Sequence, residues 1–91
     1  ETSLGVNFPN PFNPRTTINF QLSTESEIEL SIFNIKGEKV KTLIDGKLSA
    51  NFHSIEWNGT DEYGKSVSSG IYFYKMKTAR FVSTKKMILM K

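Results

Sequence analysis

Hydrophobic and polar residues alternate with a period of two along most of the chain, and no helical period is sustained. The alternation predicts strands over residues 18–22, 28–35, 40–44, 55–57, 71–76 and 81–90. Turn-forming residues separate these strands at intervals of roughly 8–12 residues, a spacing typical of an all-β sandwich or barrel. Residues 1–7 form either a linker from an upstream protein or a first edge strand. Over the whole chain we expect about seven strands.

Glycine-containing pairs mark the predicted turns between these strands. Lys36-Gly37 follows the strand at 28–35, Asp45-Gly46 is expected to stop the strand at 40–44, and Asn58-Gly59 follows Trp57. Such turn positions favour glycine, because glycine adopts a positive φ without a steric penalty.

A run of prolines and asparagines, FPNPFNP, precedes the first clear strand and covers residues 8–14. Proline fixes its own φ and drives the preceding residue into an extended conformation, so this arm should be extended, kinked and poor in ladder hydrogen bonds. Asparagine side chains can satisfy nearby backbone groups in such a segment. We predict that Phe12 packs on the sandwich as an apolar peg and that the run stiffens the start of the domain. The residues of this motif are Pro9, Asn10, Pro11, Phe12, Asn13 and Pro14.

Charge is distributed unevenly over a chain whose net charge is +3. Residues 1–62 hold five basic and nine acidic groups, whereas residues 63–91 hold seven basic and no acidic groups. Two explanations stay open: the lysines protect edge strands from pairing with other chains, or this part of the chain faces an anionic partner.

Stabilisation by disulfides or by a cysteine-based metal site is excluded, because the 91 residues include no cysteine. No apolar run approaches the length of about 18 residues that a membrane-spanning helix needs, and no charged and then apolar leader is present. The sequence begins with Glu1, and we interpret it as a piece excised from a longer protein.

No group of residues has the pattern of a catalytic site. His53 is the only histidine, and no serine lies in a nucleophile elbow that could use it. Asp61 and Glu62 are neighbours on a turn, not carboxylates that face each other across a cleft. No glycine-rich phosphate loop is present. We therefore predict a protein that is not an enzyme and has no cofactor or metal. We also predict that it does not bind nucleic acid, because its aromatic residues alternate as core residues do.

Two aromatic residues have predicted structural roles. Tyr72 follows Gly70 by two residues near the start of a late strand, the pattern of a tyrosine corner, in which the hydroxyl bonds to upstream backbone. Trp57 is predicted to anchor the core; alternatively, Trp57 and Tyr63 are exposed and stack on sugar rings. Apolar residues on both faces of the strand at 71–76 predict a central strand covered on both sides.

The stretch NGTDEYG, residues 58–64, invites comparison with a calcium-binding loop. Oxygen-bearing side chains alternate at Asn58, Thr60 and Glu62, but the closing bidentate glutamate of such loops is missing. We interpret the stretch as a turn, with a weak ion site at 58–62 as the alternative.

Several of these stretches, in this order, resemble the C-terminal sorting domain of type IX (Por) secretion substrates. The subtype is the one related to the immunoglobulin-like domain of the flagellar hook-capping protein FlgD. The resemblance covers residues 8–91 and is carried by PNPFNPRTTINF, LSIFNIKGEKVKTL, HSIEWNGTDEYGKSVSSGIYFYKM and TKKMILMK. The commonest sorting pattern has a proline before the Gly-x-Tyr element, whereas residues 67–72 read VSSGIY, the FlgD-like form.

The resemblance implies an immunoglobulin-like antiparallel β-sandwich in an exported protein of Bacteroidetes-like bacteria. It implies passage through the periplasm to the medium or the cell surface. The implied partners are the outer-membrane type IX machinery, a sortase-like peptidase and, after processing, anionic lipopolysaccharide. The segment that the family uses as its signal corresponds to Lys85, Lys86, Met87, Ile88, Leu89, Met90 and Lys91. Besides the proline arm, the structural motif residues are Trp57, Gly59, Gly64, Gly70 and Tyr72.

We therefore predict a non-catalytic module for the secretion, sorting and surface attachment of a larger exported protein. Two alternatives stay open. One is a carbohydrate-binding or adhesion sandwich, and the other is a FlgD-type structural domain of the flagellar hook cap.

Overall fold

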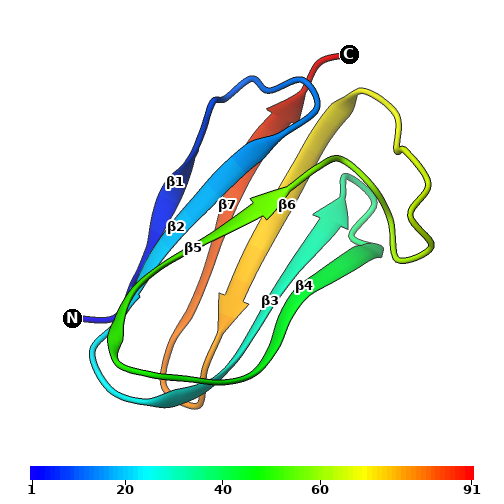
Figure 1. The fold of residues 1–91 in the computed structure, drawn as a ribbon. Helices are drawn as coiled ribbons and strands as arrows, with labels where there is room; N and C mark the ends of the chain where they lie inside the picture. Colours follow the sequence, from blue (N-terminus) through cyan, green and yellow to red (C-terminus); the bar gives the residue numbers. More distant parts are fainter.

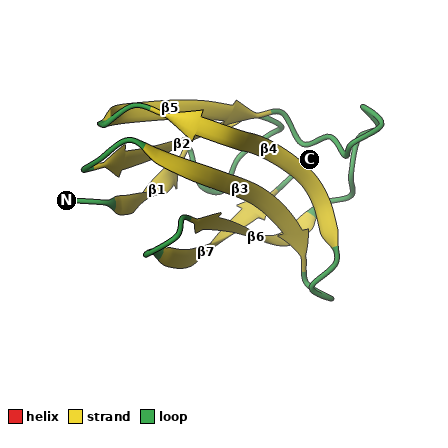
Figure 2. Cartoon of the chain, turned by 90° about the horizontal axis from the view of Figure 1, so that it is seen from below, coloured by secondary structure: helices red, strands yellow, loops and turns green.

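Seven strands in two stacked sheets make up the computed structural model, which describes all residues from 1 to 91. The strands are β1 (Ser3–Phe8), β2 (Thr16–Leu22), β3 (Ser26–Asn34), β4 (Lys39–Leu48), β5 (Asn51–Trp57), β6 (Gly70–Lys77) and β7 (Val82–Leu89). One sheet has the order β1-β2-β5 and the other the order β4-β3-β6-β7 (Figure 1). All strand pairs are antiparallel, which confirms the predicted sandwich (Figure 2). None of its segments is a helix long and apolar enough to cross a membrane.

The core lies between the two sheets and is built mainly by alternate residues of β2, β3, β6 and β7, with one residue each from β1, β5 and the proline arm. Side chains at every second position of a strand share one face, so the sequence alternation places them together. Trp57 lies at the centre of an aromatic cluster, with ring centroids 5.8 Å from Phe12 and 5.4 Å from Tyr72. The buried apolar residues are Leu4, Phe12, Ile18, Phe20, Leu22, Ile28, Leu30, Ile32, Trp57, Tyr72, Tyr74, Met76, Met87 and Leu89.

The first residues form an edge strand, which confirms one of the two predicted alternatives. Ser3–Phe8 forms β1, which pairs with β2 and has an irregular register between Leu4 and Asn7. The hydroxyl of Tyr74 donates to the backbone carbonyl of Gly5 at 2.8 Å, so β1 is also held by the opposite sheet.

The turn expected at Lys36-Gly37 is confirmed, but the one expected at Asp45-Gly46 is wrong. Gly37 has a φ of 83°, and its N–H donates to the carbonyl of Asn34 at 2.9 Å. In contrast, β4 runs through Asp45-Gly46 to Leu48, and these two residues pair with Glu29 and Ile28 of β3. Pairing with a long neighbouring strand overrides the local turn preference of this Asp-Gly pair, and the pairing is regular from Ser26 to Leu30 of β3.

The prediction that both faces of β6 are covered is wrong for its outer face. Tyr72, Tyr74 and Met76 point inward and are buried, whereas Ile71 and Phe73 on the opposite face are only half-buried. No third layer lies over the outer face of the four-stranded sheet (Figure 2). This face is therefore a surface of the molecule.

Candidate functional site

The predicted recognition segment, residues 85–91, forms the second half of β7 and the two residues that follow it. β7 is an edge strand that pairs only with β6. Its residues Met87 and Leu89 point into the core with 0% and 1% of their surface exposed. The remaining residues are half-buried or exposed at the surface: Lys85, Lys86, Ile88, Met90 and Lys91. The segment is thus a folded strand with one face in the core.

The proline arm lies beside the end of β7 and is hydrogen-bonded to it (Figure 1). The N–H of Phe12 donates to the carbonyl of Ile88 at 3.0 Å, and the N–H of Met90 donates to the carbonyl of Phe12 at 2.9 Å. These bonds form an isolated parallel bridge between Phe12 and Leu89. The side-chain carbonyl of Asn10 accepts a hydrogen bond from the N–H of Ile88 at 3.0 Å. The arm expected to be poor in ladder bonds therefore closes part of this sheet edge.

Contacts within the sandwich hold the arm in place. Phe12 is 2% exposed and packs against Trp57, which confirms its predicted role as an apolar peg. The hydroxyl of Thr16 donates to the carbonyl of Pro9 at 2.9 Å, and the amide of Asn7 donates to that hydroxyl at 3.0 Å. The other arm residues are exposed: Pro9, Asn10, Pro11, Asn13 and Pro14.

The corner before β6 has the geometry that the sequence predicts. The Tyr72 hydroxyl donates to the carbonyl of Ser68 at 2.6 Å, four residues upstream, as in a tyrosine corner. Gly70 has a φ of 155°, a conformation that residues with side chains rarely adopt. The hydroxyl of Ser69 accepts a hydrogen bond from the N–H of Lys91 at 3.0 Å, so the same corner also holds the residue that follows β7.

Trp57 is buried, and this overturns the sugar-stacking alternative for the Trp57–Tyr63 pair. Trp57 is 1% exposed, and its indole N–H donates to the carbonyl of Thr60 at 2.9 Å. Tyr63 is 87% exposed and forms no ring contact with another aromatic residue. A flat platform for a sugar ring needs exposed faces, and here one of the two rings is a core residue.

The loop after β5 uses its polar side chains to hold its own shape. The carboxylate of Asp61 accepts hydrogen bonds from two backbone N–H groups of the loop, at 2.9 and 3.0 Å. Glu62 accepts one at 2.8 Å from the backbone of β4. Gly59 and Gly64 have φ values of 75° and 79°. The loop is therefore a turn with its carboxylates engaged. No cluster of three histidine, cysteine or acidic side chains that could hold a metal forms anywhere in the molecule.

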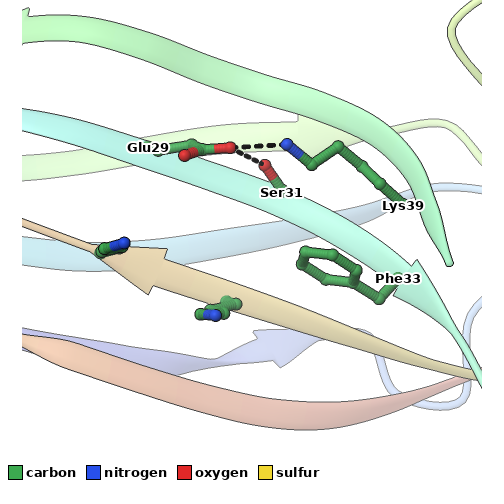
Figure 3. A pocket seen from close by; sticks show the side chains of 6 residues that line it. Glu29, Ser31, Phe33 and Lys39 are labelled. Atoms are coloured by element: carbon green, nitrogen blue, oxygen red, sulfur yellow. Dashed lines mark hydrogen bonds and ion pairs between the residues drawn. The ribbon is translucent and has the colours of Figure 1, made fainter. Parts of the chain in front are cut away.

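A second feature, which the sequence analysis missed, is a hollow on the outer face of the four-stranded sheet (Figure 3). The Glu29 carboxylate accepts hydrogen bonds from the Lys39 ammonium at 2.7 Å and from the Ser31 hydroxyl at 3.1 Å. The Lys39 bond, and then the Ser31 bond, lower the pKa of Glu29, and the same ion pair raises the pKa of Lys39. The hollow has a volume of about 180 Å³ and is lined by Glu29, Ser31, Phe33, Lys39, Lys75 and Lys77.

The signal that could have revealed this face is the order of residues at alternate positions of β6. Ile71, Phe73, Lys75 and Lys77 share the outer face, so two apolar residues are followed by two cations. A strand buried on both sides would not place lysines there. The two apolar positions alone suggested burial.

Two antiparallel sheets of three and four strands, joined by a tyrosine corner, define an immunoglobulin-like β-sandwich. The chain matches the FlgD Ig-like domain family over residues 10–80, and it belongs to this family. The matched region ends before β7, so the predicted recognition segment lies outside it. A search of curated proteins found no match.

Solved structures with the same fold include two proteins of Porphyromonas gingivalis and one of P. aeruginosa. Dimeric latent PorU has a TM-score of 0.75 and 21% identity, over 97% of this chain and 9% of that chain. FlgD from P. aeruginosa has a TM-score of 0.63 and 21% identity, over 81% of this chain and 57% of that chain. PorZ has a TM-score of 0.65 and 16% identity, over 99% of this chain and 11% of that chain. These likenesses show the shared fold, and the chain spans only part of each of these proteins.

Proposed function

We propose that this domain is a non-catalytic sorting and cell-surface attachment module of a larger exported protein, recognised through the edge of β7. The resemblance of its sequence motifs to type IX sorting domains supports this role. PorZ, which shares the fold, is described as an essential surface component of the type-IX secretion system, and this supports the same context. The proposed partners are the outer-membrane type IX machinery and a sortase-like peptidase, with anionic lipopolysaccharide as the acceptor after passage through the periplasm.

The observation that carries the proposal is the partly open backbone edge of β7. The N–H and carbonyl of Ile88 point toward the arm and are bonded to it. Backbone groups alternate between the two edges of an antiparallel strand, so those of Thr84 and Lys86 point to the same edge as Ile88. No strand pairs with them. An open row of this kind is a template to which a partner can add a strand.

Recognition would act on the folded domain and not on a flexible tag. Met87 and Leu89 fill the core, so deleting residues 87–91 would remove two buried side chains together with the bridge to Phe12. Each lost core side chain costs about 2–5 kcal/mol of stability. A truncation would therefore unfold the domain whatever its function, and substitutions at the surface are the sharper test.

The first experiment asks whether the domain directs export. Residues 1–91 would be fused to an exported reporter in a host with type IX secretion, and the reporter would be assayed in the periplasm, on the surface and in the medium. We expect surface delivery that is lost in a strain without the secretion system. A folded fusion that stays in the periplasm of the competent host would contradict the sorting function.

The second experiment asks whether the edge of β7 is the recognised part. Lys86→Pro removes a backbone N–H that faces the open edge, whereas Lys86→Ala changes only an exposed side chain. We expect the proline variant to hold the fusion in the periplasm and the alanine variant to be delivered. Urea unfolding of both purified domains serves as the control for folding. Normal delivery of a stable Lys86→Pro fusion would reject strand addition, while surface delivery of the unmodified fusion would still support sorting.

A structural role in a flagellar hook cap is the second candidate, and the FlgD Ig-like family match favours it. In that case hook-cap sequence would flank this domain in its parent gene. The reporter fusion would then show no dependence on type IX secretion.

A further inference from the structure

The outer face of the four-stranded sheet has an apolar half and a cationic half. On β6, Ile71 and Phe73 are followed on the same face by Lys75 and Lys77. On the neighbouring strand β3, Phe33 stands directly opposite Phe73. Along β6 the face thus changes from apolar to cationic, and the residues of β3 opposite Lys75 and Lys77 are Ser31 and Glu29.

A shallow groove of about 310 Å³ lies at the apolar half. Its wall includes Phe33, Ile35 and Phe73, and Ile35 is 67% exposed. Lys75 and Thr84 form the part of the wall nearest the cationic half. Apolar surface that gathers in one exposed groove marks an interaction site more often than scattered apolar residues do. The groove can receive an apolar side chain of a partner.

The lysines that line the hollow on this face outnumber its carboxylates. The hollow of Figure 3 holds three lysines, Lys39, Lys75 and Lys77, and a single carboxylate, that of Glu29. Glu29 forms its ion pair with Lys39 and also lies opposite Lys77 in the strand register, whereas Lys75 lies opposite Ser31. Protection of a sheet edge does not apply to Lys75 and Lys77, because β6 lies inside its sheet. One carboxylate does not balance three ammonium groups, so the lining of the hollow keeps an excess of positive charge that can attract an anionic group from outside.

We propose that this face binds an extended, acidic segment of a partner protein. Its apolar side chains would lie over Phe33 and Phe73, and its alternate carboxylates would lie over Lys75 and Lys77. Side chains two residues apart on a strand are separated by about 6.6 Å, and the same spacing holds along an extended segment. Apolar and acidic residues at every second position of the partner would therefore meet β6 in register.

The chemistry of the groove favours a protein segment over a polyanion without apolar groups. A sulfated sugar chain would satisfy the lysines, but it would leave the apolar groove unfilled. Proteins that bind single-stranded nucleic acid use exposed aromatic faces on which bases stack, whereas Phe33 and Phe73 are half-buried. The inference concerns a different surface from the backbone edge of β7 and does not rest on the sorting function.

The test is an NMR titration of the ¹⁵N-labelled domain with synthetic peptides. The probe peptide is nine residues long, with phenylalanine at its second and fourth positions, glutamate at its sixth and eighth, and serine elsewhere. A matched peptide carries glutamine in place of both glutamates. We expect amide shifts centred on Phe33, Phe73, Lys75 and Lys77, and binding roughly three- to tenfold weaker for the glutamine peptide, as for two surface ion pairs.

Charge reversal makes the test specific. The double variant Lys75→Glu/Lys77→Glu should no longer bind the glutamate peptide. It should instead bind a peptide with lysine in place of both glutamates. The control variant Lys65→Glu/Arg80→Glu changes two exposed cations that lie off this face and should bind like the unmodified domain. If charge reversal disturbs the spectrum of the free domain, the variant Lys75→Ala/Lys77→Ala is used in its place. This variant should bind the glutamate peptide more weakly than the unmodified domain does.

Three results would overturn the inference. The first is no saturable shift at millimolar peptide, and the second is equal binding of the glutamate and glutamine peptides. The third is tighter binding of dextran sulfate, polyuridylate or anionic vesicles than of the peptide at the same residues. None of these results bears on export of the reporter fusion, so the two proposals fail separately.

Discussion

Phe12 and Leu89 lie opposite each other in a parallel bridge, although they come from opposite ends of the chain. Two backbone hydrogen bonds of 3.0 and 2.9 Å flank the bridge, and the ring of Phe12 enters the core beside Trp57. The arm that precedes β2 and the strand that closes the sheet therefore depend on each other. Anything that releases the arm also releases the end of β7.

Removing the Phe12 ring should destabilise the domain strongly. Phe12→Ala leaves a cavity next to Trp57, and phenylalanine-to-alanine changes in a core cost about 3–5 kcal/mol. Small domains have total stabilities of about 5–15 kcal/mol, so a large part would be lost. Urea unfolding followed by Trp57 fluorescence measures the change.

Phe8→Ala is the matched control, because Phe8 borders the same arm but is 76% exposed. Its effect should stay within about 0.5 kcal/mol, as for other surface positions. Equal effects of the two substitutions would show that the arm is not anchored through Phe12.

Gly59 and Gly37 allow backbone strain to be separated from steric conflict. Both have positive φ, 75° and 83°, so alanine at either site should cost about 1–2 kcal/mol for the left-handed conformation. At Gly59 a Cβ would also lie 3.2 Å from the carbonyl oxygen of Pro14, whereas at Gly37 it would meet nothing within 4 Å. Gly59→Ala should therefore be the more destabilising change in urea unfolding. Equal losses would mean that the arm shifts away from Gly59 without penalty.

Alternation in the sequence predicted β2, β3, β6 and β7 well because each of them has one face in the core, and period two then reports burial directly. It predicted β4 and β5 too short, because β4 has no buried residue and β5 has only Trp57. It failed at Asp45-Gly46, where pairing with β3 carries the chain through a pair that favours turns. Local preference is readable from the sequence, but the length of the neighbouring strand is not. The Phe12 peg was predictable because an apolar residue among prolines and asparagines has few other roles.

The pairing of the arm with β7 could not be predicted, because it depends on two segments from opposite ends of the chain meeting at one sheet edge. No local pattern encodes that Asn10 would reach the N–H of Ile88. The open face of β6 was missed for a different reason. Ile71 and Phe73 look like core residues in sequence, and only the arrangement of the sheets shows that nothing covers them.

Lys39→Ala should raise the pKa of Glu29 toward its ordinary value. The hydrogen bond from Lys39 is the main cause that lowers this pKa, and the bond from Ser31 remains in the variant. The lowered pKa means that the pair stabilises the fold above the unfolded-state pKa near 4.5, and that this stabilisation is lost as the pH falls through the folded-state value. NMR titration of the Glu29 side-chain carboxyl measures this pKa in the unmodified domain and in the variant. An unchanged titration midpoint would show that the ion pair does not persist in solution.

Tyr74 should make the domain sensitive to alkaline pH. Burial raises the pKa of its hydroxyl above the ordinary value of 10.0, and the hydroxyl donates to the carbonyl of Gly5 at 2.8 Å. The unfolded chain loses this proton near pH 10.0 while the folded domain keeps it. The contribution of Tyr74 is therefore fully present below that pH and is lost as the pH rises toward the folded-state pKa.

Tyr74→Phe isolates this effect. At pH 7 the variant should be less stable by about 1–3 kcal/mol, because the carbonyl of Gly5 loses its buried donor. Between pH 9 and 11 it should lose less stability than the unmodified domain, since the ionisable group is gone. Tyr63→Phe, at an 87% exposed position, should leave both the stability at pH 7 and the pH profile unchanged. Urea unfolding across this range decides the matter: parallel losses in Tyr74→Phe and the unmodified domain would show that another group controls alkaline unfolding.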